Sequence, residues 1–214
     1  MWSTIRDIQF FIDQNYEISL PEGEVITELI EKSKQTSLTD EDYQRLYNFM
    51  EAHVYDPSEY HASLQIIRNS EPILYDFLEQ IESMSWDWDI RFYKKYTIRM
   101  TLYGSGGSYR PNEGRIIIYT TKDGQFKKYQ DPAYTLIHEI VHLCIEEVII
   151  QHFNVPHGLK ERIVDRMVVL CYGSNLPLYQ VQNMGDSNLD TYFYKLEHLK
   201  TLPECIENYI SQNK

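Results

Sequence analysis

The stretch LIHEIVHLCIEEVII, from Leu136 to Ile150, decides how the rest of the chain is interpreted. Its apolar residues recur at the spacing of a helix that enters a hydrophobic core. His138, Glu139 and His142 interrupt this apolar pattern. Because burial of polar side chains is unfavourable unless each gains a partner, the stretch predicts a core helix that carries a chemical site.

Residues 138–142 form the pattern His-Glu-x-x-His. His138 and His142 are four residues apart, so they lie on one helix face, about 6 Å apart along the axis. Two imidazoles in this position can bind one zinc ion at about 2.0–2.1 Å. Glu139 is rotated by about 100° and suits a general base for a metal-bound water. The alternative is a pair of satisfied core histidines beside an inert carboxylate.

A third ligand must come from another element. Glu146 continues the histidine face, but it lies two turns, about 12 Å, from His138 along the helix axis. Without a break in the helix the two side chains cannot reach one ion, so Glu146 is expected at the rim of a cleft. The next predicted helix, Leu159 to about Tyr172, offers Glu161 and Asp165 at the edge of its apolar stripe.

This arrangement resembles the gluzincin clan of zinc metallopeptidases, in which H-E-x-x-H is followed after about 18 residues by Glu. Here 18 residues separate His142 from Glu161. In thermolysin-like members an Asp follows that Glu by four positions, as Asp165 does. The resemblance implies three ligands to one zinc ion per chain, namely His138, His142 and Glu161, with Glu139 as base and acid. It also implies that Asp165 accepts a hydrogen bond from the far nitrogen of a ligand histidine.

Two features of the clan are not found in this sequence. The Gly-Ala-Met-Glu-Asn segment of the aminopeptidases is absent, and the chain ends too soon after Glu161 for the usual oxyanion-stabilising Tyr or His. The candidates for that role are His157, Tyr172, Tyr192, Tyr194 and His198. The sequence does not choose among them, because a single residue among 18 tyrosines carries little information.

The remaining pattern predicts an α+β fold with a helical N-terminal region, residues 1–88, and a zincin-like domain, residues 89–214. Helices are expected over Thr4–Gln14, Glu22–Lys34 and Thr39–His53, from Pro57 onward, and from Ser70 to about Met84. In the second part, Asp131-Pro132 starts the active-site helix, which runs to about Phe153. The Glu-bearing helix follows, and two C-terminal helices are expected over Leu189–Leu199 and Pro203–Ser211.

A β-hairpin is predicted just before the active-site helix. The segment YTIRMTLYG places Tyr96, Ile98, Met100 and Leu102 on one face, and RIIIYTT from Arg115 to Thr121 gives a second strand. The glycine-rich loop between them lacks the Walker pattern, which argues against phosphate binding. Because zincins bind an extended peptide beside an edge strand, Arg115–Thr121 is the candidate edge.

Charge, cysteine content and apolar runs limit the expected partners and location of the protein. The formal charge of −12 argues against nucleic acid and against an anionic membrane surface as partners. Three cysteines without a Cys-x-x-Cys pair indicate free thiols. The N-terminus lacks the features of a secretory signal, and no apolar run has the length of a membrane span. A cytoplasmic location is therefore expected, with export by a non-classical route left open.

The function expected from the sequence is zinc-dependent hydrolysis of a peptide or protein substrate. One alternative is a regulatory metalloprotein that cleaves a single intracellular partner, such as a repressor. Another is a catalytically inactive zincin-like binding protein. The sequence leaves open the substrate, endo- or exo-cleavage, the oligomeric state and the role of the N-terminal helices.

Overall fold

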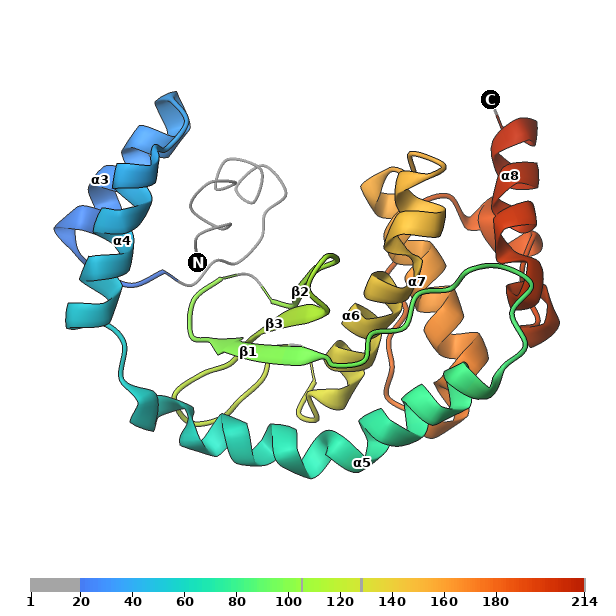
Figure 1. Cartoon of the computed structure of the whole chain (residues 1–214), viewed down its shortest axis with the longest axis horizontal. Coiled ribbons are helices and arrows are strands. Elements are labelled where there is room, and N and C mark those ends of the chain that lie inside the picture. The colour runs from blue at the N-terminus through green and yellow to red at the C-terminus, as the bar shows by residue number, and fades with distance from the viewer. Residues whose placement is uncertain (1–19, 105, 128, 214) are drawn as a thin grey trace.

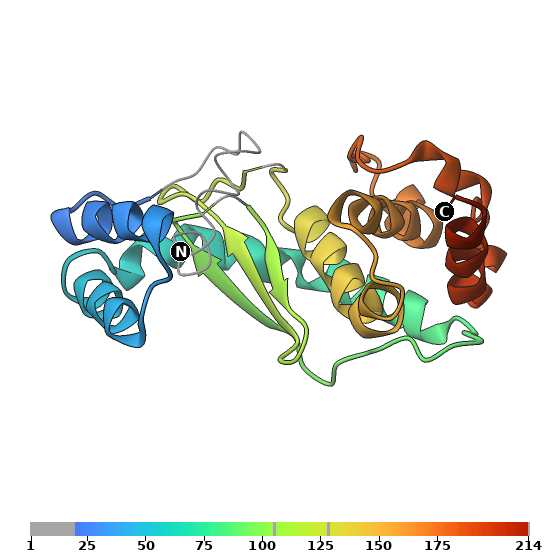
Figure 2. The same cartoon turned by 90° about the horizontal axis from the view of Figure 1, so that it is seen from above.

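A computed structural model describes residues 20–104, 106–127 and 129–213. Across these residues the chain is α+β, with six α-helices and a three-stranded mixed sheet, and most of it is helical. The long helix α5 runs along one side, with the sheet over its first part and helices α6 and α7 over its second part (Figure 1). The α3–α4 pair stands beyond one end of this body and α8 at the other (Figure 2). The helix expected over Thr4–Gln14 lies outside the described residues.

The helices of the described residues are α3 (Glu24–Gln35), α4 (Asp40–His53), α5 (His61–Ser83), α6 (Ala133–Ile145), α7 (His157–Tyr172) and α8 (Leu202–Gln212). The strands are β1 (Thr97–Thr101), β2 (Ser108–Arg110) and β3 (Arg115–Tyr119). A π-helical segment, Glu146–Gln151, extends α6, and short 3-10 helices cover Pro57–Tyr60, Gly173–Asn175, Ser187–Thr191 and Leu196–Thr201. Among the described helices, none combines the length and apolarity needed to cross a membrane.

The helices predicted from Pro57 and from Ser70 form one helix, α5, after a 3-10 turn, so the predicted division is wrong. Pro72 lies inside this helix and removes one backbone hydrogen bond. The buried residues Ile67, Leu74 and Phe77 nevertheless keep the helical spacing across it. Burial of this continuous stripe against the core stabilises the helix more than the missing bond weakens it.

The helix predicted over Leu189–Leu199 is also wrong, because two separate 3-10 turns occupy that segment. Asp186 accepts a hydrogen bond from Asn188 N at 3.0 Å and so caps the first turn. Arg162 of α7 holds Asp190 through two bonds of 2.8 Å. These contacts fix the first turn against α7, and the chain turns again before α8.

The sheet differs from the predicted hairpin. β1 pairs with β3 in parallel, and β3 also pairs with β2 in antiparallel, so the strand order is β1-β3-β2. The glycine-rich connection itself contains β2, and Gly114 at φ 56° allows the tight turn from β2 into β3. Arg115–Thr121 is therefore central, and its assignment as an edge strand is wrong. The edge strand that contacts α6 is β2.

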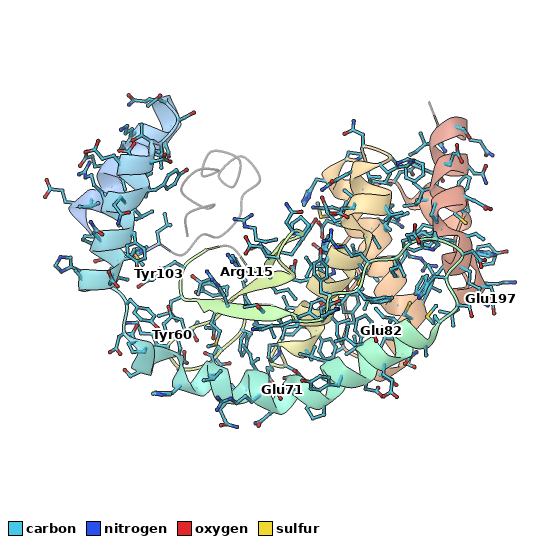
Figure 3. All side chains as sticks on the ribbon, viewed as in Figure 1. Tyr60, Glu71, Glu82, Tyr103, Arg115 and Glu197 are labelled. Atoms are coloured by element: carbon cyan, nitrogen blue, oxygen red, sulfur yellow. The ribbon has the colours of Figure 1, made fainter. Side chains whose placement is uncertain are left out.

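A single core joins α5, β3, α6 and α7. Helix α6 lies at its centre, since Thr135 alone of its residues is not buried. Side chains fill the space between α5, the sheet and α6, while Tyr60 and Tyr103 lie where the first 3-10 turn approaches the end of β1 (Figure 3). Because this core includes α5, it crosses the predicted boundary at residue 88. The division into two regions stays a prediction.

Helices α3 and α4 have a small core of their own, made of Ile26, Leu29 and Leu46. Thr39 caps α4 in a capping box with Asp42. Lys32 of α3 donates to both Asp42 carboxylate oxygens, at 2.8 and 2.7 Å. The Lys32 and Thr39 bonds lower the pKa of Asp42 to about 2, so this carboxylate is ionised at neutral pH.

We expect Asp42→Ala to loosen the α3–α4 pair, because the substitution removes the carboxylate that accepts hydrogen bonds from Thr39 N and from Lys32. Amide hydrogen exchange of both helices should become several-fold faster, measured by mass spectrometry at pH 7. The control is Asp40→Ala, which removes an exposed carboxylate from the same helical turn. Equal exchange rates in the two variants would contradict this account.

Candidate metal centre

Helix α6 brings the two histidines of the motif into the core. Asp131 Oδ1 accepts the expected kind of hydrogen bond, from Ala133 N at 2.9 Å, but the helix begins one residue later than predicted and Pro132 is its N-cap. His138 and His142 follow one turn apart, and their side chains are buried. Both rings face the N-terminal half of α7, where Glu161 is also buried.

Three ligand atoms converge at this point. His138 Nε2 lies 3.0 Å from His142 Nε2, and Glu161 Oε2 lies 3.2 Å from each of the two nitrogens. Among the described residues, this is the group of histidine, cysteine and carboxylate side chains that could hold a metal ion. The structure thus brings together the three residues that the sequence predicted as ligands.

The separations fit zinc. Ligands at about 2.0–2.1 Å in a tetrahedral site lie about 3.3 Å from one another. The observed values of 3.0 and 3.2 Å are close to this distance. Two imidazoles and one carboxylate are a donor set typical of catalytic zinc, which keeps a fourth position for water or substrate.

Glu139 lies beside the ligand group without joining it. Its side chain is buried, and it is not one of the three residues that could hold a metal ion. The backbone of Gly107, just before β2, approaches closely: a Cβ there would lie 2.4 Å from Glu139 Oε1, so a larger residue would displace this carboxylate. Burial raises the pKa of Glu139 to about 7, with a further contribution from Glu161.

The surroundings stabilise positive charge at His138 but not at His142. Burial lowers the pKa of His138, but Asp165 and Glu161 outweigh this effect and raise it to about 9. Burial lowers the pKa of His142 to about 4. Burial acts to raise the pKa of Glu161, but the two histidines hold it well below its ordinary range. A divalent cation bound here would also supply positive charge next to the buried carboxylates.

Asp165, expected behind a ligand histidine, is fully buried beside His138. Its Oδ1 lies 3.3 Å from His138 Nδ1, but the Tyr179 hydroxyl is closer to that nitrogen, at 2.7 Å. Gln182 Nε2 donates to Glu161 Oε2 at 3.2 Å. Sequence reasoning missed Tyr179 and Gln182, because they stand in an irregular segment where no periodicity marks which side chains face inward.

A second group of side chains covers the His142 side of the site. The Tyr109 ring, on β2, stacks on the His142 ring at 4.8 Å between centroids. The Tyr109 hydroxyl donates to Glu146 Oε2 at 2.5 Å and accepts from Lys160 Nζ at 3.3 Å. Glu146, at the start of the π-helical segment, is thus engaged outside the three-ligand group.

Four of the five candidates for stabilising the oxyanion make contacts away from the three-ligand group. Tyr172 donates to Asp76 of α5, and Tyr192 donates to Gln212 of α8. Tyr194 and His198 contact one another near the start of α8. Among these five residues, only His157 borders the ligand group: its Nδ1 lies 3.5 Å from Glu161 Oε1.

Comparisons with known proteins add no relative. The chain matches no protein-family model, no curated protein and no solved structure.

We expect Glu161→Ala to weaken zinc binding far more than Glu146→Ala, because only Glu161 places an oxygen between the two histidines. The predicted loss for Glu161→Ala is at least about a hundredfold in affinity. Competition with a chromophoric chelator measures it, and circular dichroism checks that both variants fold. The reverse ranking would mean that the third ligand is wrongly assigned.

Proposed function

We propose that the protein is a zinc-dependent hydrolase that cleaves peptide bonds. The observation that carries this proposal is the convergence of His138 Nε2, His142 Nε2 and Glu161 Oε2 beside the buried Glu139 carboxylate. A purely structural zinc site has no use for a carboxylate in that position, whereas hydrolysis requires a base there.

The three ligands would hold the ion and leave one side open. When bound, zinc lowers the pKa of a water molecule towards about 7 and polarises the substrate carbonyl. Glu139 accepts the proton that the attacking water loses and returns it to the leaving amine. The close backbone of Gly107 limits the room available to this carboxylate and so helps to orient it towards the site.

Strand β2 is the proposed substrate-binding edge. It lies at one edge of the sheet, contacts α6, and carries Tyr109 against His142. An extended peptide that pairs with such an edge gains backbone hydrogen bonds independently of its sequence. The sequence suggests β3 as this edge, but β3 is paired with a strand on both sides.

The relation to gluzincins is part of the proposal. It is supported by the 18-residue spacing between His142 and Glu161 and by Asp165 four residues further on. A general peptidase and a protease dedicated to one partner would share this site. Cleavage of an unbiased peptide library supports the first, and cleavage of one cellular protein supports the second.

We expect Glu139→Gln to keep zinc and to lose hydrolysis by at least about a hundredfold, because the amide cannot accept the proton. Hydrolysis is measured on a fluorogenic peptide library with zinc-loaded protein. The control, Glu147→Gln, changes an exposed carboxylate that pairs with Arg91 and should leave the rate unchanged. Full activity in Glu139→Gln would contradict the proposed base, and zinc-loaded wild type that cleaves no substrate would favour a binding protein.

A further inference from the structure

The segment between α7 and α8 supplies outer contacts to two of the proposed ligands. Residues 179–182 have no regular secondary structure. Tyr179 and Gln182 are partly buried and turn towards the site, whereas Leu178 and Val181 are exposed. The Tyr129 ring stacks on the Tyr179 ring at 6.2 Å between centroids and so supports the tyrosine from the other side.

Tyr179 stands between His138 and Asp165. Its hydroxyl donates to Asp165 Oδ1 at 2.6 Å and lies 2.7 Å from His138 Nδ1. Since the single hydroxyl proton goes to the carboxylate, the hydroxyl oxygen accepts from the imidazole N–H. The direct separation of 3.3 Å between His138 Nδ1 and Asp165 Oδ1 is a poorer hydrogen-bond distance than either of these.

Asp165 is anchored on both oxygens. Tyr179 occupies Oδ1, and the backbone N–H of Gln182 donates to Oδ2. The carboxylate is fully buried, so its charge acts on its neighbours with little screening by water. One short segment thus fixes both the anion and the hydroxyl that the anion orients.

The direction of these bonds determines the tautomer of His138. A proton on Nδ1, held by Tyr179, leaves the Nε2 lone pair directed at His142 and Glu161. His142 differs, because no described group hydrogen-bonds its buried Nδ1, and the stacked Tyr109 ring holds it instead. Of the two histidines, His138 is therefore the one whose ring is oriented by hydrogen bonds to its outer nitrogen.

We propose that Tyr179 is a positioning residue of the metal site that relays the charge of Asp165 to His138. This inference rests on the proposed metal site but not on hydrolysis. It differs from the sequence expectation, in which Asp165 itself accepts from a ligand histidine.

The test is zinc affinity in Tyr179→Phe, measured by chelator competition. Loss of the hydroxyl should weaken binding by about ten- to a hundredfold, the range for outer partners of metal ligands. It should also shift the visible absorption of the cobalt(II)-loaded protein, which reports ligand geometry. The control is Tyr172→Phe, which removes a partly buried tyrosine–aspartate hydrogen bond between α7 and α5. It should lower thermal stability and leave affinity within about twofold and the cobalt spectrum unchanged.

A double-mutant cycle with Asp165→Asn separates a relay from two independent contacts. In a relay, the double variant binds zinc about as weakly as the weaker single variant. Additive losses, or wild-type affinity in Tyr179→Phe, would overturn the proposal even if the protein hydrolyses peptides. If Tyr179→Phe does not fold, wild-type affinity in Asp165→Asn overturns it equally. A zinc-binding wild type without hydrolysis would remove the proposed function and leave this inference standing.

Discussion

Charge buried in the centre of the core is the constraint on which the site depends. His138, His142, Glu139, Glu161 and Asp165 are all less than 10 % exposed, at 9, 2, 7, 7 and 0 %. Three carboxylates so placed repel one another unless positive charge lies among them. Lys160, with Nζ 3.8 Å from Glu161 Oε1, supplies one positive charge at the edge of the group. A divalent cation between the two histidines and Glu161 would supply the rest.

Several elements of the fold hold this group in place. Helix α6 is apolar on nearly all its faces, so it packs between α5, α7 and the sheet and carries its histidines inside. The sheet contributes through β2, where Tyr109 covers His142 and the preceding Gly107 approaches Glu139. The irregular segment at Tyr179 contacts His138 and Glu161 from a further side. Regular helices thus carry the proposed ligands, and the connecting segments contact them from outside.

The convergence of His138, His142 and Glu161 could be predicted because much of the information for it is local. A four-residue spacing fixes two histidines on one helix face, and α7 presents Glu161 at its N-terminal end. The sheet could not be predicted, because β2 is only three residues long within a glycine-rich segment and the β1–β3 pairing joins distant residues. The predicted division of α5 near Pro72 is wrong, because packing against the core stabilises the helix more than the one missing hydrogen bond destabilises it. Tyr179 had no local signal among 18 tyrosines.

The central claim is that one zinc ion is held by His138, His142 and Glu161. X-ray absorption at the zinc edge tests it most directly, on protein loaded with one equivalent of zinc and then desalted. The account predicts retained zinc with only nitrogen and oxygen ligands at about 2.0–2.1 Å and outer scattering from two imidazole rings. Loss of zinc during desalting, or a shell of sulfur ligands at about 2.3 Å, would contradict it.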